Sequence, residues 1–225
     1  MGQRVEFPSN GHTCQGYFAA PESGEGPGVV VIQEWWGLVP HIEDIVERFA
    51  KAGFAAIAPD LYHGQTTTSP DEAGRMLMEL DLARAETEIA GAGAYLVGRP
   101  ECTSKKFGVI GFCMGGALAQ HEATVNPDNV AAAVSFYGGF KKVATPWDDL
   151  QAPILLIYGE KDQGVPAEKG RELEQTLREK GKDVELMIYP GANHAFMNNT
   201  GPNYKPDAAQ DAWQRAVDFL RKHIQ

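Results

Sequence analysis

Short runs of apolar and β-branched residues recur along this chain, separated by longer segments with helical spacing. Buried parallel strands have this composition, and two consecutive parallel strands need a crossover segment, usually a helix, between them. The alternation therefore predicts an α/β fold, with a mostly parallel central sheet and helices on both faces. The predicted strands are Val29–Ile32, Phe54–Ala58, Phe107–Ile110, Val130–Phe136, Ile154–Tyr158 and Val184–Tyr189.

The segments around these strands predict three helices and one further strand pair. Apolar spacing predicts helices over His41–Ala52, over a long stretch that follows Ser69-Pro70, and from about Asp207 onward. The first 20 residues alternate polar and apolar side chains, which favours an antiparallel pair at one sheet edge. With no internal repeat or linker in the 225 residues, we expect one domain over residues 1–225.

Charge and hydropathy narrow the classes of partner. The formal net charge of −10 repels nucleic acid and anionic membrane surfaces. The N-terminal residues hold no apolar stretch of secretory length, and no run approaches the roughly 18 apolar residues that span a bilayer. We therefore expect a cytoplasmic monomer whose partner is a small molecule rather than nucleic acid or a membrane.

The stretch Lys106–Gln120 has the pattern of a strand, a sharp turn and a helix, with Cys113 on the turn. Such a turn raises a nucleophile above the sheet edge, and Gly111 and Gly115 leave room where a Cβ atom would collide. The N-terminus of the following helix favours a thiolate and offers N–H groups to an oxyanion. The competing interpretation is a small buried cysteine among packing glycines, and the Gly-x-Cys-x-Gly-Gly setting disfavours it.

Two other strand ends supply partners for this cysteine. His194 and Asp162 each follow an apolar strand, at the sheet end where open α/β folds build their sites. Glu160 and Asp60 also follow strands, but the order Cys113, Asp162, His194 is the nucleophile, acid and histidine order of α/β hydrolases. The remaining histidines are expected at the surface or at helix caps: His12, His41, His63, His121 and His223.

At these residues the chain resembles the dienelactone hydrolase (carboxymethylenebutenolidase) family over essentially its full length. The resemblance implies the α/β-hydrolase fold and a triad of Cys113, Asp162 and His194, with no metal or organic cofactor required. The matching motifs, in the family's order, are Val31–Gly37, Ala58–Tyr62, Gly111–Gly116, Phe136–Gly138, Gly159–Asp162 and His194–Phe196.

The resemblance assigns roles to residues that flank the nucleophile. It implies that Glu34 lies close to the cysteine and helps to activate its thiol, and that the backbone N–H groups of Trp35 and Met114 form the oxyanion hole. From the residues alone, Glu34 is also suited to hydrogen-bonding its own turn. Plain core packing is the alternative for one of the two tryptophans, Trp35 and Trp36.

The chain departs from the family where a substrate carboxylate would bind. Members that hydrolyse dienelactone hold that carboxylate with arginines, one of them four residues after the catalytic histidine, where this chain has Asn198. Ala195 replaces a serine, and the second arginine position falls near Pro70, with Arg75 the nearest basic residue. We expect the anion clamp to be absent. The predicted substrate contacts are Trp36, Phe196 and Asn198.

These features together predict a cysteine hydrolase that opens an ester or lactone through a thioester intermediate. His194 would act as general base and acid, while Asp162 orients it. Two other classes remain open. One is a noncatalytic ligand-binding protein of the same fold with an inert Cys113. The other is a thiol redox protein, which would need Cys14 or Cys102 close to Cys113.

Overall fold

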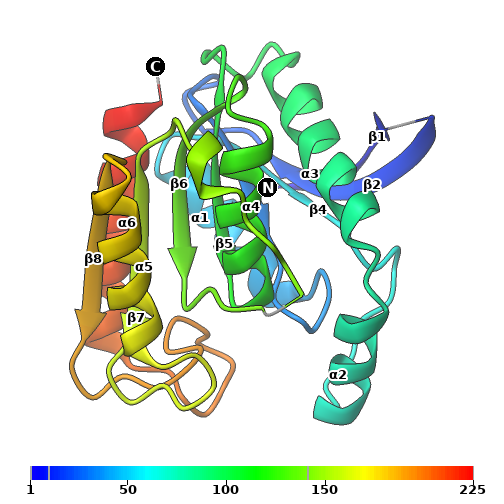
Figure 1. Ribbon diagram of the computed structural model, residues 1–225. Coiled ribbons are helices and arrows are strands. Elements are labelled where there is room, and N and C mark those ends of the chain that lie inside the picture. The colour runs from blue at the N-terminus through cyan, green and yellow to red at the C-terminus, as the bar shows by residue number, and fades with distance from the viewer. Residues whose placement is uncertain (1, 10, 141, 225) are drawn as a thin grey trace.

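The computed structural model describes residues 2–9, 11–140 and 142–224, which form one eight-stranded sheet in the order β1-β2-β4-β3-β5-β6-β7-β8 (Figure 1). The strands are β1 (Gln3–Ser9), β2 (His12–Ala19), β3 (Gly28–Ile32), β4 (Ala55–Pro59), β5 (Phe107–Phe112), β6 (Val130–Phe136), β7 (Ile154–Gly159) and β8 (Val184–Tyr189). The helices are α1 (Pro40–Lys51), α2 (Pro70–Glu79), α3 (Leu82–Val97), α4 (Met114–Val125), α5 (Ala167–Glu179) and α6 (Pro206–His223), with a 3-10 turn η1 (Trp147–Asp149).

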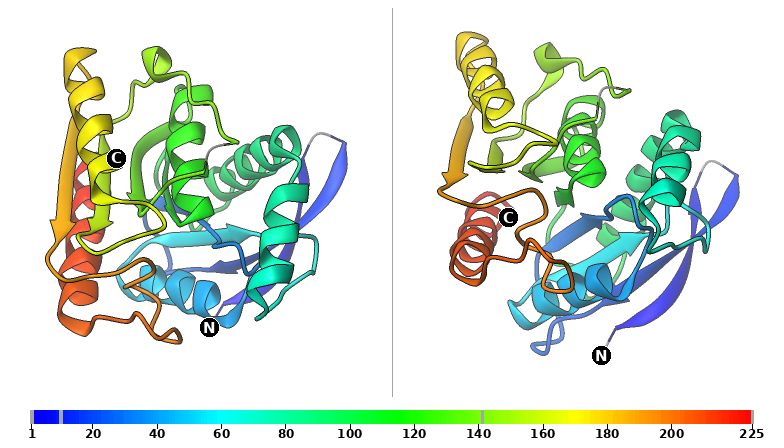
Figure 2. Two further views of the ribbon diagram at one scale, coloured as in Figure 1. Left: turned by 60° about the horizontal axis from the view of Figure 1, so that its bottom comes forward. Right: turned by 90° about the horizontal axis from the view of Figure 1, so that it is seen from below.

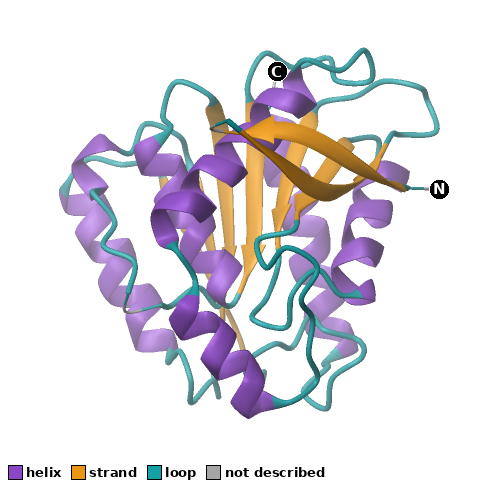
Figure 3. Cartoon of the chain, turned by 90° about the vertical axis from the view of Figure 1, so that its right-hand side faces the viewer, coloured by secondary structure: helices purple, strands orange, loops and turns teal. Residues whose placement is uncertain are grey.

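The predicted mostly parallel sheet is confirmed. Strands β3 to β8 pair in parallel, and every residue of β3, β4, β5 and β7 is buried, as expected of strands covered on both faces. The hairpin of β1 and β2 is also confirmed, and β2 joins β4 in antiparallel pairing. Figure 3 shows this twisted hairpin crossing the edge of the sheet.

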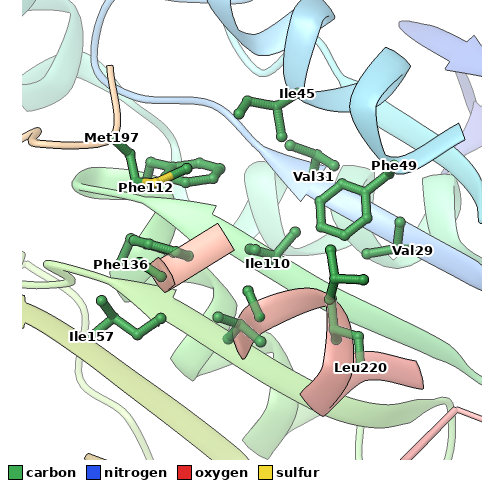
Figure 4. Packing of buried hydrophobic residues seen from close by; sticks show 14 of the residues in the cluster. Val29, Val31, Ile45, Phe49, Ile110, Phe112, Phe136, Ile157, Met197 and Leu220 are labelled. Carbon is green, nitrogen blue, oxygen red and sulfur yellow. The ribbon is translucent and has the colours of Figure 1, made fainter. Parts of the chain in front are cut away.

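Helices cover both faces of the sheet. α1 and α6 pack on one face, and α3, α4 and α5 pack on the other (Figures 1 and 2). On the first face, Phe49 of α1 and Leu220 of α6 meet side chains from the central strands, including Val29 and Ile110 (Figure 4). Within the described ranges, no helix is both long enough and apolar enough to cross a membrane.

The long helix predicted after Ser69-Pro70 is two helices. α2 ends at Glu79 and α3 begins at Leu82, because the side chain of Asp81 accepts a hydrogen bond from the backbone N of Arg84 at 3.1 Å and caps α3. Lys142 Nζ donates to the carbonyls of Met78 and Leu80, at 2.9 and 3.0 Å. α2 therefore projects beside the lower end of the sheet in Figure 1.

A buried carboxyl group on α4 sets one pH dependence of stability. Burial raises the pKa of Glu122 to about 7; Asn126 donates to its Oε1 at 2.8 Å, while no described residue bonds its Oε2. Because the unfolded carboxyl ionises at lower pH, this group favours folding below about pH 4.5, and that contribution is lost as pH rises to about 7.

We therefore expect Glu122→Gln to stabilise the fold by up to roughly 3 kcal/mol at pH 8.5 and by less at pH 5.5. Thermal unfolding at the two pH values measures the difference. Glu168→Gln, at an exposed carboxylate on α5, is the matched control and should change stability at neither pH. An equal gain at both pH values would contradict this account.

Candidate active site

The carboxyl ends of the parallel strands lie at the bottom of Figure 1, where the loops after β7 and β8 gather. Cys113 lies at this end, directly between β5 and α4, with φ of 56° and ψ of −115°. A left-handed φ is strained for cysteine and holds its side chain on a sharp turn. A Cβ atom on Gly111 would lie 1.9 Å from the carbonyl oxygen of Gly115, so glycine is required there, as predicted.

Two residues near this turn were expected to supply backbone N–H donors. Met114 is the first residue of α4, so its N–H has no acceptor within the helix. Trp35 follows β3 and lines the same cavity as Cys113. Of the two residues expected to form an oxyanion hole, Met114 thus directly follows Cys113, and Trp35 lines the same cavity.

His194 and Asp162 form a hydrogen-bonded pair. Nδ1 of His194 lies 2.7 Å from Oδ2 of Asp162, on the loops that follow β8 and β7. The Asp162 side chain is fully buried, and its Oδ1 accepts backbone N–H bonds from Gly164 and Val165, both at 2.8 Å. Those two bonds fix the carboxylate, so its other oxygen holds the imidazole in one orientation.

The surroundings of His194 favour a charged imidazole. Burial opposes the charge, but hydrogen bonds to Asp162 and Cys113 and the negative charges of both groups raise the pKa of His194 to about 10. His194 therefore carries a proton at neutral pH that it can give to a leaving group.

Glu34 follows β3 and is buried, with 1% of its surface exposed. Its Oε2 accepts a hydrogen bond from Nδ2 of Asn198 at 3.0 Å. Burial raises the pKa of Glu34 to about 7, while the bond from Asn198 and the charge of His194 act in the opposite direction. Glu34 lines the cavity with Cys113, so the two residues that the resemblance associates do share one site.

Tyr137 belongs to this group, although the sequence analysis gave it no role. It follows β6 with a left-handed φ of 40°, and its ring centroid lies 4.9 Å from that of His194. Burial and the charges of Glu34, Cys113 and Asp162 raise its pKa well above the usual value. The available signal was position, because Tyr137 directly follows a predicted strand at the same sheet end.

The cavity over these groups has a volume of about 460 Å³. Trp35 and Trp36 meet edge to face on its wall, with ring centroids 4.9 Å apart. Among the described residues that line it, none is lysine or arginine. Its lining comprises Glu34, Trp35, Trp36, Leu77, Cys113, Gly164, Val165, His194, Ala195, Asn198, Gly201, Pro202 and Asn203.

Two sequence expectations need correction. Phe196 was expected to contact substrate, but it is fully buried and packs against Phe136, Tyr137 and Tyr189, because the chain turns back into the core after His194. His41 was expected at the surface or at a cap, but it is 4% exposed within the first turn of α1.

The other cysteines lie outside the cavity. Cys14 is buried in β2, and Cys102 pairs through the backbone with Gly26, near the start of β3 and thus at the opposite end of the sheet from Cys113. Neither lines the cavity, so the thiol redox alternative gains no resolving cysteine from this arrangement.

Both a family model and individual proteins of known sequence are similar to this chain over most or all of its length. The family model described as "Dienelactone hydrolase family" matches residues 14–224. "Protein usf" of Aquifex pyrophilus is 38% identical over 231 residues, and a "Putative carboxymethylenebutenolidase" of Aquifex aeolicus is 36% identical over 231 residues; each alignment covers 100% of both chains.

Solved structures show the same likeness. The crystal structure of a "Putative Dienelactone Hydrolase" from Klebsiella pneumoniae superposes with a TM-score of 0.89 at 30% identity and covers 98% of each chain. An acylaminoacyl peptidase from Pyrococcus horikoshii has a TM-score of 0.78 at 15% identity, over 99% of this chain and 41% of that one, which is a likeness of fold.

Proposed function

Because the chain belongs to the dienelactone hydrolase family and has the α/β-hydrolase fold, it is a carboxymethylenebutenolidase-like hydrolase, and we propose that it cleaves esters or lactones with Cys113 as nucleophile. One observation carries the proposal. The pair of His194 and Asp162, joined at 2.7 Å, lies at the cavity that holds Cys113 on its strained turn. In this proposal Cys113 is the nucleophile, His194 the base and Asp162 the orienting acid, each from a separate strand end.

The proposed reaction is a two-step acyl transfer. The Cys113 thiolate attacks the carbonyl carbon, a C–S bond forms, and N–H groups of Met114 and Trp35 stabilise the oxyanion. The C–O bond then breaks, and the His194 imidazolium gives its proton to the departing oxygen. Water attacks the resulting thioester with His194 as base, which releases the acid and restores the ion pair. Asp162 keeps the imidazole in the required tautomer throughout.

Trapping the acyl-enzyme tests this proposal. The protein is mixed with p-nitrophenyl acetate, quenched in acid within the first turnover, digested and examined by mass spectrometry. We expect an acetyl group on the peptide that contains Cys113, while the peptides with Cys14 and Cys102 serve as internal controls. A burst of nitrophenol with no label on Cys113 would refute the thioester mechanism.

The lining of the cavity favours a neutral acyl group. Trp35, Trp36, Leu77, Val165 and Pro202 supply apolar wall. A substrate carboxylate would meet the buried acid Glu34 with no lysine or arginine among the described lining residues, and the charge of His194 is already paired with Asp162. We therefore propose that the natural substrate is an uncharged ester or lactone with a small apolar acyl part.

A substrate panel checks that preference. We expect kcat/KM for a neutral lactone or enol ester to exceed that of its carboxylated counterpart by at least about tenfold, because a buried unpaired carboxylate costs more than about 1.4 kcal/mol. Pairs that differ only in methyl ester against free acid isolate the charge. Preference for the free acid would mean that a basic residue outside the described lining reaches the substrate.

A further inference from the structure

The buried carboxyl group of Glu34 is held by an uncharged partner. Within the described part of the chain, its side chain accepts one hydrogen bond, from the amide of Asn198. Asn198 is itself 7% exposed, so this bond joins two buried groups across 164 positions of sequence. An amide supplies a donor without supplying charge.

The orientation of that amide is fixed from the other side. Oδ1 of Asn198 accepts hydrogen bonds from the backbone N and from Oγ1 of Thr200, at 3.0 and 2.6 Å. With its oxygen committed to these two donors, Asn198 must turn its NH2 group toward Glu34. The chain of contacts therefore runs from an exposed hydroxyl to a buried carboxyl at the cavity.

The titratable groups around Glu34 come from three other elements. They are Cys113 at the start of α4, Tyr137 after β6 and His194 after β8, with Asp162 behind His194. His194 is the one group among these that carries positive charge, and that charge is shared with Cys113 and Asp162. After burial, the bond from Asn198 has the largest influence on how easily Glu34 ionises.

Building on the proposed role of Cys113, we propose that Asn198 is a positioning residue that fixes the Glu34 carboxyl in the cavity that Cys113 lines, through an uncharged donor, and so sets the pH at which Glu34 changes its protonation. The chemical reason is that an amide N–H stabilises a carboxylate only modestly. A guanidinium in the same place would neutralise the charge and keep Glu34 ionised. With the amide, burial prevails, and Glu34 exchanges its proton near neutrality.

The direction in which each substitution shifts the titration of Glu34 follows from this arrangement. We call the midpoint that this titration produces in a pH–rate profile the Glu34 inflection. Asn198→Leu removes the donor, so the Glu34 inflection should move up by about half to one pH unit. Asn198→Arg supplies a charge that never titrates, so the inflection should move down by about one unit or more. Thr200→Val, at an exposed residue, frees the amide oxygen from one donor and should move the inflection up by a smaller amount.

The experiment measures the rate of alkylation of Cys113 by iodoacetamide, and kcat/KM for a neutral p-nitrophenyl ester, from pH 5 to 9 in each variant. Glu34→Gln should abolish the inflection, and its loss would identify the inflection as the titration of Glu34. Asn129→Leu, an exposed amide at the opposite end of β6, should leave it in place. A loss of rate that is uniform across pH, with no displaced midpoint in the Leu, Arg or Val variants, overturns the role of Asn198.

The two proposals fail separately. If acyl-enzyme trapping finds no thioester on Cys113, the proposed function fails, while the alkylation midpoints still report whether Asn198 controls Glu34. If the thioester is found and the midpoints do not move, the role of Asn198 fails alone. Because Thr200 is exposed, Thr200→Val keeps the test decisive even where Asn198→Leu does not fold.

Discussion

Replacing Cys113 by alanine should lower kcat/KM for p-nitrophenyl acetate and for lactones by at least about 10⁴-fold, because the described residues that line the cavity include no other thiol or hydroxyl. Alanine is smaller than cysteine and keeps the strained backbone of the turn without adding bulk, so the fold should be retained. The measurement is steady-state hydrolysis, with circular dichroism and thermal unfolding to confirm the fold.

Cys102→Ala is the matched control for this variant. Its thiol lies near the start of β3, outside the cavity, so hydrolysis should stay within about twofold of the parent. Hydrolysis that persists in the Cys113 variant at the parent rate would eliminate the cysteine mechanism and would require a different nucleophile.

Asp162→Asn should lower kcat by about 10³ to 10⁴-fold. The Oδ1 of Asp162 is committed to two N–H donors, so the amide NH2 of asparagine would face His194 and donate where the native carboxylate accepts. The imidazole would then take the wrong tautomer. The same change removes an interaction that raises the pKa of His194, so the basic limb of the rate profile should move below pH 10.

Glu160→Gln is the control for the acid. Glu160 follows the same strand, is exposed, and its Oε2 accepts a hydrogen bond from the backbone N of Gly191 at 2.8 Å. It makes no contact with the His194 ring, so kcat should remain within about twofold. Equal losses in the two variants would show that the loop as a whole, rather than the carboxylate of Asp162, supports the reaction.

Much of this architecture is predictable because it depends on local chemistry. Parallel strands that are buried on both faces are continuous apolar runs, and the runs were visible at β3, β4, β5 and β7. The turn at Cys113 was equally visible, because only glycine fits where Gly111 and Gly115 approach each other. The ends of successive parallel strands necessarily meet at one edge, which brings Asp162 and His194 together.

The remaining features depend on contacts between distant segments. The spacing of apolar residues continued from α2 into α3, and the break was set by the capping side chain of Asp81. Phe196 stands two residues from His194, yet the chain turns into the core between them. The bond between Asn198 and Glu34 joins residues 164 positions apart, a distance over which sequence patterns carry no information about pairing.

The cavity wall that α2 supplies is less firmly supported by the core than the residues proposed for the chemistry. It contributes Leu77 to the wall, yet only Ala73 and Met76 among its ten residues are buried. The residues proposed for the chemistry, by contrast, follow strands that pack in the core: Cys113, Asp162 and His194. Substitutions on α2 thus reshape the space for the acyl group at little cost in folding free energy, and mutational drift in such a chain can change substrate preference while its chemistry is conserved.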